Sequence, residues 1–325
     1  MKHLMKPLLL ILDDWEGLIQ KAVCWNQLKD LVEIKFLKES IERTSDFEIE
    51  QAQFLMAVRE RTSLNEQLFK RMPKLKLVLQ TGGHAYHIDR VAAKQQNIVI
   101  ASGRQVKAPL ASVPELTFAF ALGLMHKVYQ AQRLMQNGGW DLLTGRTLSN
   151  KRLGILGLGR HGSRVAHIAS TAFNMEVVAW NRNENTNGKN DGFKRLPLDE
   201  LLETSDIVSI HLRLSEESTG LINKERLAKM KPDALLINTS RGAIVDENAL
   251  IEALKNGRLA GAGLDVFSHE PLAVDSPLRM FDNVILTPHI GWTAEEVFEE
   301  FADIACTQLM EYLNGNLENT ELLKH

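Results

Sequence analysis

Short apolar runs separated by polar segments recur along the chain. In the first hundred residues, five runs have the length and the aliphatic or β-branched content of buried strands: residues 7–12, 32–37, 54–58, 75–79 and 98–101. Apolar residues at helical spacing fill some of the intervals between them. Strands that alternate with helices predict a parallel α/β sheet.

The pattern changes after the fifth strand. A long apolar helix is predicted over residues 114–135, and a second α/β unit then runs from Arg152 to about Gly291. Thr293 and Glu296 have the spacing of a capping box, which predicts the start of a final amphipathic helix. The chain has 325 residues. Because this length exceeds the size at which a single core stops growing, we expect two domains.

Composition and charge restrict the partners. The net charge of −3 provides no basic field, so we expect no nucleic acid. Cys24 and Cys306 have no metal-ligand spacing and cannot form a disulfide framework, so no metal site is expected. No apolar run approaches the roughly 18 residues that span a membrane, and Asp13 and Asp14 interrupt the N-terminal run too early for a signal peptide. We therefore expect a cytoplasmic protein without a membrane partner.

A glycine-rich turn follows the first strand of the second unit. The run 153–156 leads into Gly157-Leu158-Gly159-Arg160-His161-Gly162, and helical spacing follows. In such a turn Gly157 permits the tight bend, Gly159 lets a pyrophosphate approach the backbone, and Gly162 lets helix and strand pack closely. Another strand follows at residues 175–180. The segment therefore predicts a dinucleotide site, with these cofactor-binding candidates: Gly157, Gly159, Arg160, His161 and Gly162.

The end of the strand at residues 175–180 bears on the choice of cofactor. An acidic residue about twenty positions after the glycines ordinarily binds the ribose 2′-hydroxyl of NAD. Here Asn181 and Arg182 follow the strand, with no acid. Asn181 does not repel a 2′-phosphate and Arg182 can pair with one, so NADP is slightly favoured over NAD. In the alternative, Arg182 points into solvent and NAD binds through Asn181.

Three later strand-like runs each precede polar residues. Residues 234–238 precede Arg241, residues 260–264 precede Asp265 and Glu270, and residues 283–286 precede His289. The carboxyl ends of parallel strands meet at one edge of a sheet, where ligands bind. A cation, two carboxylates and an imidazole at that edge predict a catalytic site. Taken singly, each of them is more often a surface charge or a structural polar residue.

The segment from Ser205 to Gly291 resembles the D-isomer-specific 2-hydroxyacid dehydrogenase family, which includes phosphoglycerate dehydrogenases and hydroxypyruvate reductases. The resemblance is carried by residues 205–212, 230–232, 238–242, 261–267, 270–271 and 287–291. It extends more weakly over the first hundred residues. It implies two doubly wound parallel-sheet domains of the α/β class: a Rossmann cofactor domain at residues 111–292 and a discontinuous, flavodoxin-like substrate domain at residues 1–110 and 293–325.

The residues and the resemblance agree on the chemistry. Arg241 can clamp a substrate carboxylate with two parallel hydrogen bonds. His289, as imidazolium, can protonate the developing alkoxide, and Glu270 favours the charged imidazole if the two pair. We therefore predict hydride transfer between NAD(P)H and a small 2-keto acid. The resemblance implies further cofactor contacts for His211, Thr239, Asp265 and Gly291. Alternatively, Asp265 does not contact the cofactor and instead caps a helix that follows its strand.

The resemblance also implies a substrate-binding turn and a homodimer. Arg59, Gly82 and Gly83 are candidate substrate contacts, and His84 stands where the family has a second glycine. The roles of Arg104, Lys107 and Trp292 stay open. The apolar segment 114–135 can serve a dimer through the cofactor domain, and an ordinary buried helix is the alternative. Relatives that act as NADH-sensing corepressors share the Arg-Glu-His trio, so a binding protein without turnover is the alternative function.

Overall fold

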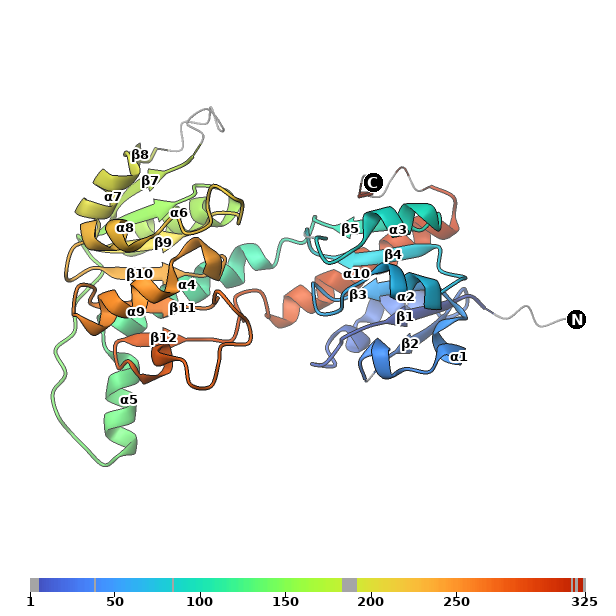
Figure 1. The fold of residues 1–325 in the computed structure, drawn as a ribbon, viewed down its shortest axis with the longest axis horizontal. Coiled ribbons are helices and arrows are strands. Elements are labelled where there is room, and N and C mark those ends of the chain that lie inside the picture. Colours follow the sequence, from blue (N-terminus) through green and yellow to red (C-terminus); the bar gives the residue numbers. More distant parts are fainter. Residues whose placement is uncertain are drawn as a thin grey trace, which may run out of the picture. The chain divides into compact units, whose positions relative to one another are not determined.

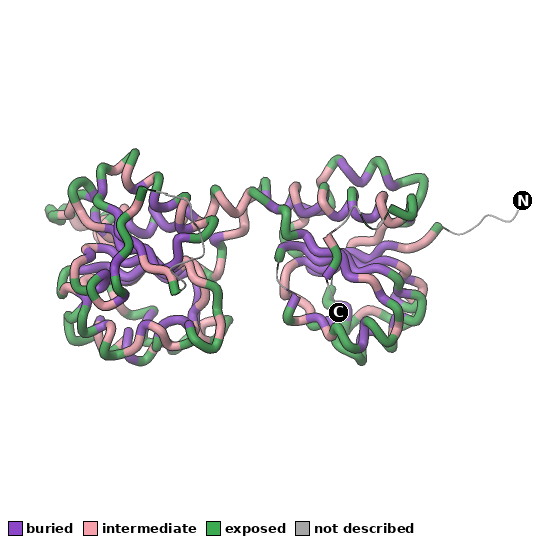
Figure 2. Tube along the Cα trace, turned by 90° about the horizontal axis from the view of Figure 1, so that it is seen from above, coloured by how far each residue is buried: buried purple, intermediate pink, exposed green. Residues whose placement is uncertain are grey.

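The computed structural model describes residues 6–37, 39–83, 85–182, 192–316, 318 and 321–323. The chain divides into two compact units, residues 1–108 with 293–325 (unit 1) and residues 109–292 (unit 2). Each unit is built on one parallel sheet (Figure 1). In both, the buried residues concentrate in the strands, and the exposed residues lie on the surrounding helices and loops (Figure 2).

The sheet of unit 1 has five parallel strands in the order β2-β1-β3-β4-β5. Their bounds are β1 (Leu8–Ile11), β2 (Glu33–Phe36), β3 (Ala52–Ala57), β4 (Leu77–Thr81) and β5 (Val99–Gly103). This is the order of flavodoxin-like, doubly wound sheets, so the predicted fold class is confirmed for this unit. All five predicted strands are present, with ends that differ from the prediction by at most two residues.

The helices of unit 1 pack on this sheet. They are α1 (Asp46–Ile49), α2 (Glu66–Arg71), α3 (Arg90–Gln95) and α10 (Glu295–Leu313). Helix α10 contacts β4 and β5 and buries Phe298, Phe301 and Leu309. The predicted capping box is wrong. The structure places the N-cap of α10 at Ala294 rather than at Thr293, and the alanine methyl group accepts no hydrogen bond.

The sheet of unit 2 has seven parallel strands in the order β12-β11-β10-β9-β6-β7-β8. Their bounds are β6 (Arg152–Leu156), β7 (Glu176–Trp180), β8 (Lys194–Arg195), β9 (Ile207–Ile210), β10 (Leu235–Asn238), β11 (Gly261–Leu264) and β12 (Val284–Leu286). From β8 to β11 this is the Rossmann order 3-2-1-4-5-6, so the predicted fold class is confirmed here too. The winding reverses between β6 and β9, which places the ligand crevice at their carboxyl ends.

The helices of unit 2 are α4 (Pro109–Met125), α5 (Val128–Gln136), α6 (Arg160–Ala172), α7 (Leu198–Thr204), α8 (Lys224–Lys229) and α9 (Glu247–Lys255). The single helix predicted over residues 114–135 is wrong. Lys127 adopts the left-handed conformation, with φ of 56°, and this separates α4 from α5. Helix α4 also begins earlier, at Pro109, because proline is tolerated in the first turn of a helix.

Two segments of unit 2 have little apolar content. The two-residue strand β8 was not predicted, because both of its residues are exposed and carry no apolar signal. The polar loop predicted from Asn181 continues into residues 183–190, which lie outside the described residues. Within the part of the chain that the structure describes, no helix is both long enough and apolar enough to cross a membrane.

Candidate active site

Three neighbouring strands of unit 2 carry the polar residues that the sequence singles out. Strands β10, β11 and β12 are paired in parallel and lie side by side in Figure 1. Arg241 follows β10, Asp265 follows β11 directly, and His289 follows β12. The fold therefore brings these residues to the same edge of one sheet.

His289 and Glu270 are hydrogen-bonded partners. Nδ1 of the imidazole lies 2.7 Å from Oε2 of Glu270, and Oε1 of the same carboxylate accepts the backbone N–H of Phe267 at 3.0 Å. Burial favours the protonated carboxyl, but the hydrogen bonds from His289 and Phe267 outweigh burial and lower the pKa of Glu270. The positive charge of Arg241 acts in the same direction. Glu270 is therefore ionised at neutral pH, as a partner of an imidazolium must be.

Asp265 organises the turn that carries His289. Its side chain is 1% exposed. One carboxylate oxygen accepts the Thr287 hydroxyl at 2.5 Å and the Ile290 N–H at 2.7 Å, and the other accepts the Gly291 N–H at 2.8 Å. Burial raises the pKa of Asp265, and these three hydrogen bonds oppose the rise. Both oxygens are thus engaged within the protein, and the implied cofactor contact of Asp265 stays a prediction.

Arg241 is fixed by the backbone around it. Its guanidinium donates to the Ser240 carbonyl at 2.7 Å, and the Asn238 amide donates to the Arg241 carbonyl at 3.0 Å. The next residue is Gly242, where a Cβ would lie 1.9 Å from the carbonyl carbon of Phe267. Only glycine allows this approach, so the Arg241 backbone lies against the segment that leads to Glu270.

The glycine-rich turn has the geometry of a phosphate-binding loop. Gly157 has φ of 98°, and its N–H donates to the Trp180 carbonyl at 2.8 Å. A Cβ on Gly162 would lie 2.1 Å from the Gly157 carbonyl oxygen, whereas a Cβ on Gly159 would meet no atom within 4 Å. Gly159 is the N-cap of α6 and has no side chain with which to cap the helix. A helix N-terminus with open space beside Gly159 favours an anion, which fits a dinucleotide pyrophosphate.

Two further cofactor candidates, His211 and Thr239, directly follow the neighbouring strands β9 and β10. Nε2 of His211 lies 2.8 Å from the Ser209 hydroxyl, and the Thr239 hydroxyl lies 3.2 Å from that of Thr117. Burial lowers the pKa of His211 to about 3, and the nearby His161 imidazole adds a smaller electrostatic effect in the same direction. Burial also lowers the pKa of His161, and the adjacent Arg160 adds to the effect. Both imidazoles are therefore neutral at pH 7.

The predicted substrate contacts of unit 1 gather where β3 and β4 end. The Arg59 N–H donates to the Thr81 hydroxyl at 2.7 Å. The guanidinium of Arg59 crosses Gly82 so closely that a Cβ there would lie 2.7 Å from Nη1. Gly82 has φ of 77°, which a side chain would disfavour, and Gly83 is exposed. Arg59, Gly82 and Gly83 therefore form one cluster at the carboxyl edge of this sheet.

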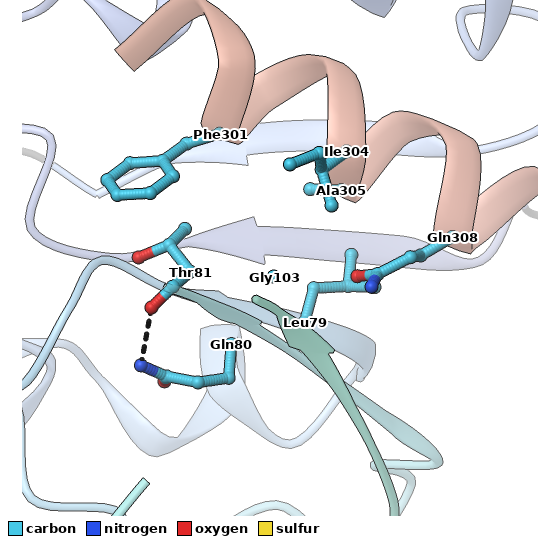
Figure 3. A pocket seen from close by; sticks show the side chains of 8 residues that line it. All are labelled: Leu79, Gln80, Thr81, Gly103, Phe301, Ile304, Ala305 and Gln308. Carbon is cyan, nitrogen blue, oxygen red and sulfur yellow. Dashed lines mark hydrogen bonds between the residues drawn. The ribbon is translucent and has the colours of Figure 1, made fainter. Parts of the chain in front are cut away.

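A narrow crevice lies behind this edge, between α10 and the ends of β4 and β5 (Figure 3). It leaves no room for a water molecule. The Gln80 amide donates to the Thr81 carbonyl at 2.8 Å, and the Gln308 amide donates to the Ser102 carbonyl at 2.9 Å. The Gln308 amide links α10 to β5, and the crevice is a packing feature. Its lining residues are Leu79, Gln80, Thr81, Gly103, Phe301, Ile304, Ala305 and Gln308.

Comparison with known proteins identifies the architecture. Residues 118–291 match the sequence profile of the NAD-binding domain of the D-isomer specific 2-hydroxyacid dehydrogenases. The chain belongs to this family. The predicted resemblance is therefore confirmed.

Full-length relatives extend the similarity beyond the cofactor domain. A hydroxypyruvate reductase of Blautia hydrogenotrophica is 33% identical over 316 residues, which cover 94% of each chain. A glyoxylate reductase of Thermofilum pendens is 37% identical over 273 residues, 80% of each chain. Among solved structures, a D-lactate dehydrogenase of Aquifex aeolicus, complexed with NAD and lactic acid, is 30% identical, with a TM-score of 0.78 and 96% coverage of both chains.

One part of the site in this family member was not anticipated. The amide oxygen of Asn181 accepts the Leu158 N–H of the glycine-rich turn at 2.6 Å. The guanidinium of Arg182 donates to the Ser215 hydroxyl at 3.1 Å and to Glu217 at 2.9 Å. Ser215 and Glu217 follow β9, on the other side of β6 from β7. The sequence signal for Ser215 and Glu217 is the polar segment after β9, the strand that pairs with β6.

The residues whose roles the sequence left open have local contacts. Arg104 lies 3.5 Å from Glu321, and the Lys107 backbone donates to Glu300 at 2.7 Å. Trp292 is half-buried, and His84 lies outside the described residues. Among the residues that the structure describes, no cluster of three or more His, Cys, Asp or Glu could hold a metal ion.

Proposed function

We propose that the chain reduces a small 2-keto acid to the D-2-hydroxy acid with NAD(P)H. The relatives named hydroxypyruvate reductase and glyoxylate reductase support this class of substrate. The observation that carries the proposal is the 2.7 Å contact between His289 and Glu270, at the sheet edge that also carries Arg241. An imidazolium held by a carboxylate beside a guanidinium suits the protonation of a carbonyl oxygen next to a carboxylate.

Arg241, His289 and Glu270 have separate roles in the proposed reaction. The bound nicotinamide supplies the hydride. Arg241 holds the substrate carboxylate with two parallel hydrogen bonds, which orients the carbonyl carbon for attack. Because Nδ1 of His289 is engaged by Glu270, Nε2 is the ring atom left to face the substrate. His289 donates the Nε2 proton to the oxygen as negative charge develops there, and Glu270 stabilises the imidazolium before transfer.

The proposed cofactor site is the glycine-rich turn with the strand ends next to it. Gly157, Gly159 and Gly162 shape the turn, and Arg160 and His161 begin α6 beneath the pyrophosphate. We propose that His211, Thr239 and Gly291 complete the site, and that Asp265 acts through the turn that it holds. We also propose a slight preference for NADP(H), because Arg182 is a cation where an acid ordinarily selects NAD.

In unit 1, we propose that Arg59 and the backbone N–H groups of Gly82 and Gly83 contact the substrate. The left-handed Gly82 and the exposed Gly83 support a turn that presents its backbone to an anion. The guanidinium of Arg59 adds a positive charge to the same cluster. Loss of keto-acid affinity in Arg59→Ala, with unchanged dinucleotide affinity, would test this assignment.

We further propose a homodimer. Much of α4 is buried within unit 2, so this helix fits the alternative of an ordinary buried helix better than a dimer surface. In contrast, α5 has no buried residue, and the loop after it exposes 85% of Trp140 and 93% of Leu142. Contiguous exposed apolar patches mark interaction sites, and we propose that these side chains contribute to one. Light scattering at micromolar concentration should give twice the chain mass, and Leu142→Asp should lower it.

A substrate screen tests the proposed reaction. The purified chain is incubated with glyoxylate, hydroxypyruvate, pyruvate and larger 2-keto acids, each with NADH or NADPH, and oxidation of the nicotinamide is followed by its absorbance. The chiral products are then separated on a chiral column. The proposal expects turnover of at least one keto acid and the D-hydroxy acid as product. Formation of the L-hydroxy acid would overturn it.

A further inference from the structure

The cation at the end of β7 is held by a carboxylate from another loop. The Arg182 guanidinium donates to Glu217 Oε2 at 2.9 Å and to the Ser215 hydroxyl at 3.1 Å. Arg182 follows β7 and Glu217 follows β9, and these strands flank β6 on opposite sides. The ion pair therefore bridges the two loops that border the carboxyl end of β6, where the glycine-rich turn begins.

Asn181 cannot take the place of the missing acid in full. Its amide oxygen already accepts the Leu158 N–H at 2.6 Å, so the groups that it still offers are mainly the two N–H donors of its amide nitrogen. A ribose hydroxyl that donates a hydrogen bond needs an acceptor. Among these contacting residues, Glu217 alone carries a carboxylate, and the side chain is 66% exposed.

The carboxylate of Glu217 is charged under working conditions. Its own backbone N–H, the Ser215 hydroxyl and the charge of Arg182 together lower the pKa of Glu217. A 2′-phosphate that approaches Arg182 must therefore compete with a fixed anion for the same guanidinium. It is also repelled by that anion. An uncharged 2′-hydroxyl meets neither obstacle.

We infer that Glu217 is a specificity-determining residue for the dinucleotide: by holding Arg182, it weakens binding of a 2′-phosphate and so keeps the preference for NADP(H) small. The inference rests on the proposed function, because it concerns the same cofactor site. Glu217 acts mainly through Arg182 and adds a direct repulsion of its own. The two contributions are separable by combining substitutions.

Dissociation constants of NADPH and NADH, measured by nicotinamide fluorescence, test the inference. The variants are Glu217→Gln, Arg182→Ala and the double substitution. Glu216→Gln is the matched control, because it removes the same charge from the adjacent exposed position. Glu217→Gln should bind NADPH roughly threefold to tenfold more tightly, the size expected for release of an exposed ion pair together with a like charge. NADH affinity should stay unchanged or fall.

Two further results are expected. The gain in NADPH affinity should shrink in the Arg182→Ala background, because no guanidinium remains to be released. It should also shrink at high salt, because the charges are exposed and screened. An unchanged NADPH affinity in Glu217→Gln, or an equal gain in Glu216→Gln, would overturn the inference while the proposed function stands. If the wild-type chain bound neither dinucleotide, the proposed function itself would fail.

Discussion

Nδ1 of His289 lies 2.7 Å from Oε2 of Glu270, and the same carboxylate accepts the Phe267 N–H through its other oxygen. The carboxylate is thus fixed from two sides and fixes the imidazole in turn. The pKa of Glu270 is lowered, so this carboxylate is ionised at neutral pH. This contact turns Nδ1 of His289 towards Glu270.

The first prediction concerns pH. Reduction of a keto acid should fall as the pH rises, because His289 must be protonated to donate. Glu270→Gln keeps the shape of the side chain but removes the charge that stabilises the imidazolium, so the fall should occur at lower pH. A pH profile of kcat/KM for both proteins gives the answer. Superimposable profiles would show that the two groups are not coupled.

The same pair affects stability with a defined sign. The pKa of Glu270 is lower in the folded chain than its ordinary value, so the pair stabilises the fold at neutral pH. This contribution is lost as the pH falls through the folded-state value. Urea unfolding should therefore show Glu270→Gln to be less stable than wild type at pH 7, with the difference vanishing in acid. If Glu270→Gln were still less stable than wild type in acid, the loss of stability would not come from the charge of Glu270.

The second prediction concerns Arg241. Arg241→Lys keeps the charge but loses the planar fork, so kcat/KM for the keto acid should drop roughly 10- to 150-fold, as expected for lost charge-assisted hydrogen bonds. Dinucleotide affinity should be retained. Arg258→Lys, at an exposed position of the same unit, is the control and should be neutral. Unchanged kinetics in Arg241→Lys would remove the proposed carboxylate clamp.

The third prediction separates two glycines of the turn. Gly159→Ala places a methyl group where no protein atom lies within 4 Å, so the free energy of unfolding should change by less than about 1 kcal/mol. The same methyl group would obstruct the pyrophosphate, and dinucleotide affinity should fall sharply. Gly162→Ala would clash with the Gly157 carbonyl at 2.1 Å and should destabilise the fold by about 1–3 kcal/mol. Urea unfolding and fluorescence titration measure the two effects, and full dinucleotide binding by Gly159→Ala would argue against this site.

The fourth prediction concerns the turn after β12. Asp265→Ala leaves the Thr287 hydroxyl and the N–H groups of Ile290 and Gly291 without their acceptor. Unfolding in urea should show a loss of about 1–3 kcal/mol, the cost of buried polar groups without partners. Thr287→Val removes only one of the three hydrogen bonds and should cost less. Equal stability of Asp265→Ala and wild type would mean that the turn is held by other contacts.

Much of this fold could be predicted from local sequence. Strands β10 to β12 are short apolar runs because both faces of a parallel sheet are covered, and the polar residues after them had to meet at one edge. The break between α4 and α5 could not be predicted, because Lys127 takes a left-handed conformation without the glycine or proline that usually marks such a point. The exposed residues of β8 likewise give no signal.

Within the candidate site, several contacts of the predicted residues could not be read from the sequence. The pairing of Arg182 with Glu217 joins positions 35 residues apart that follow different strands. The three hydrogen bonds of Asp265 depend on the path of the turn after β12. Neither the ion pair nor the hydrogen bonds of Asp265 can be predicted from spacing along the chain. The proposed slight preference for NADP(H) rests on the missing acid, on Asn181 and on Arg182, and the carboxylate of Glu217 beside Arg182 opposes it.

The most direct test of the central claim is the turnover number of keto-acid reduction in wild type and His289→Asn. His126→Asn, which changes an exposed histidine of the same unit, serves as the control. Wild type and the control should turn over the best keto acid equally, and His289→Asn should be about 10²–10⁴-fold slower, the usual contribution of a general acid, with dinucleotide affinity kept. A His289→Asn variant within threefold of wild type would contradict the account. So would a wild-type chain that binds the dinucleotide yet reduces no keto acid, the behaviour of a sensor.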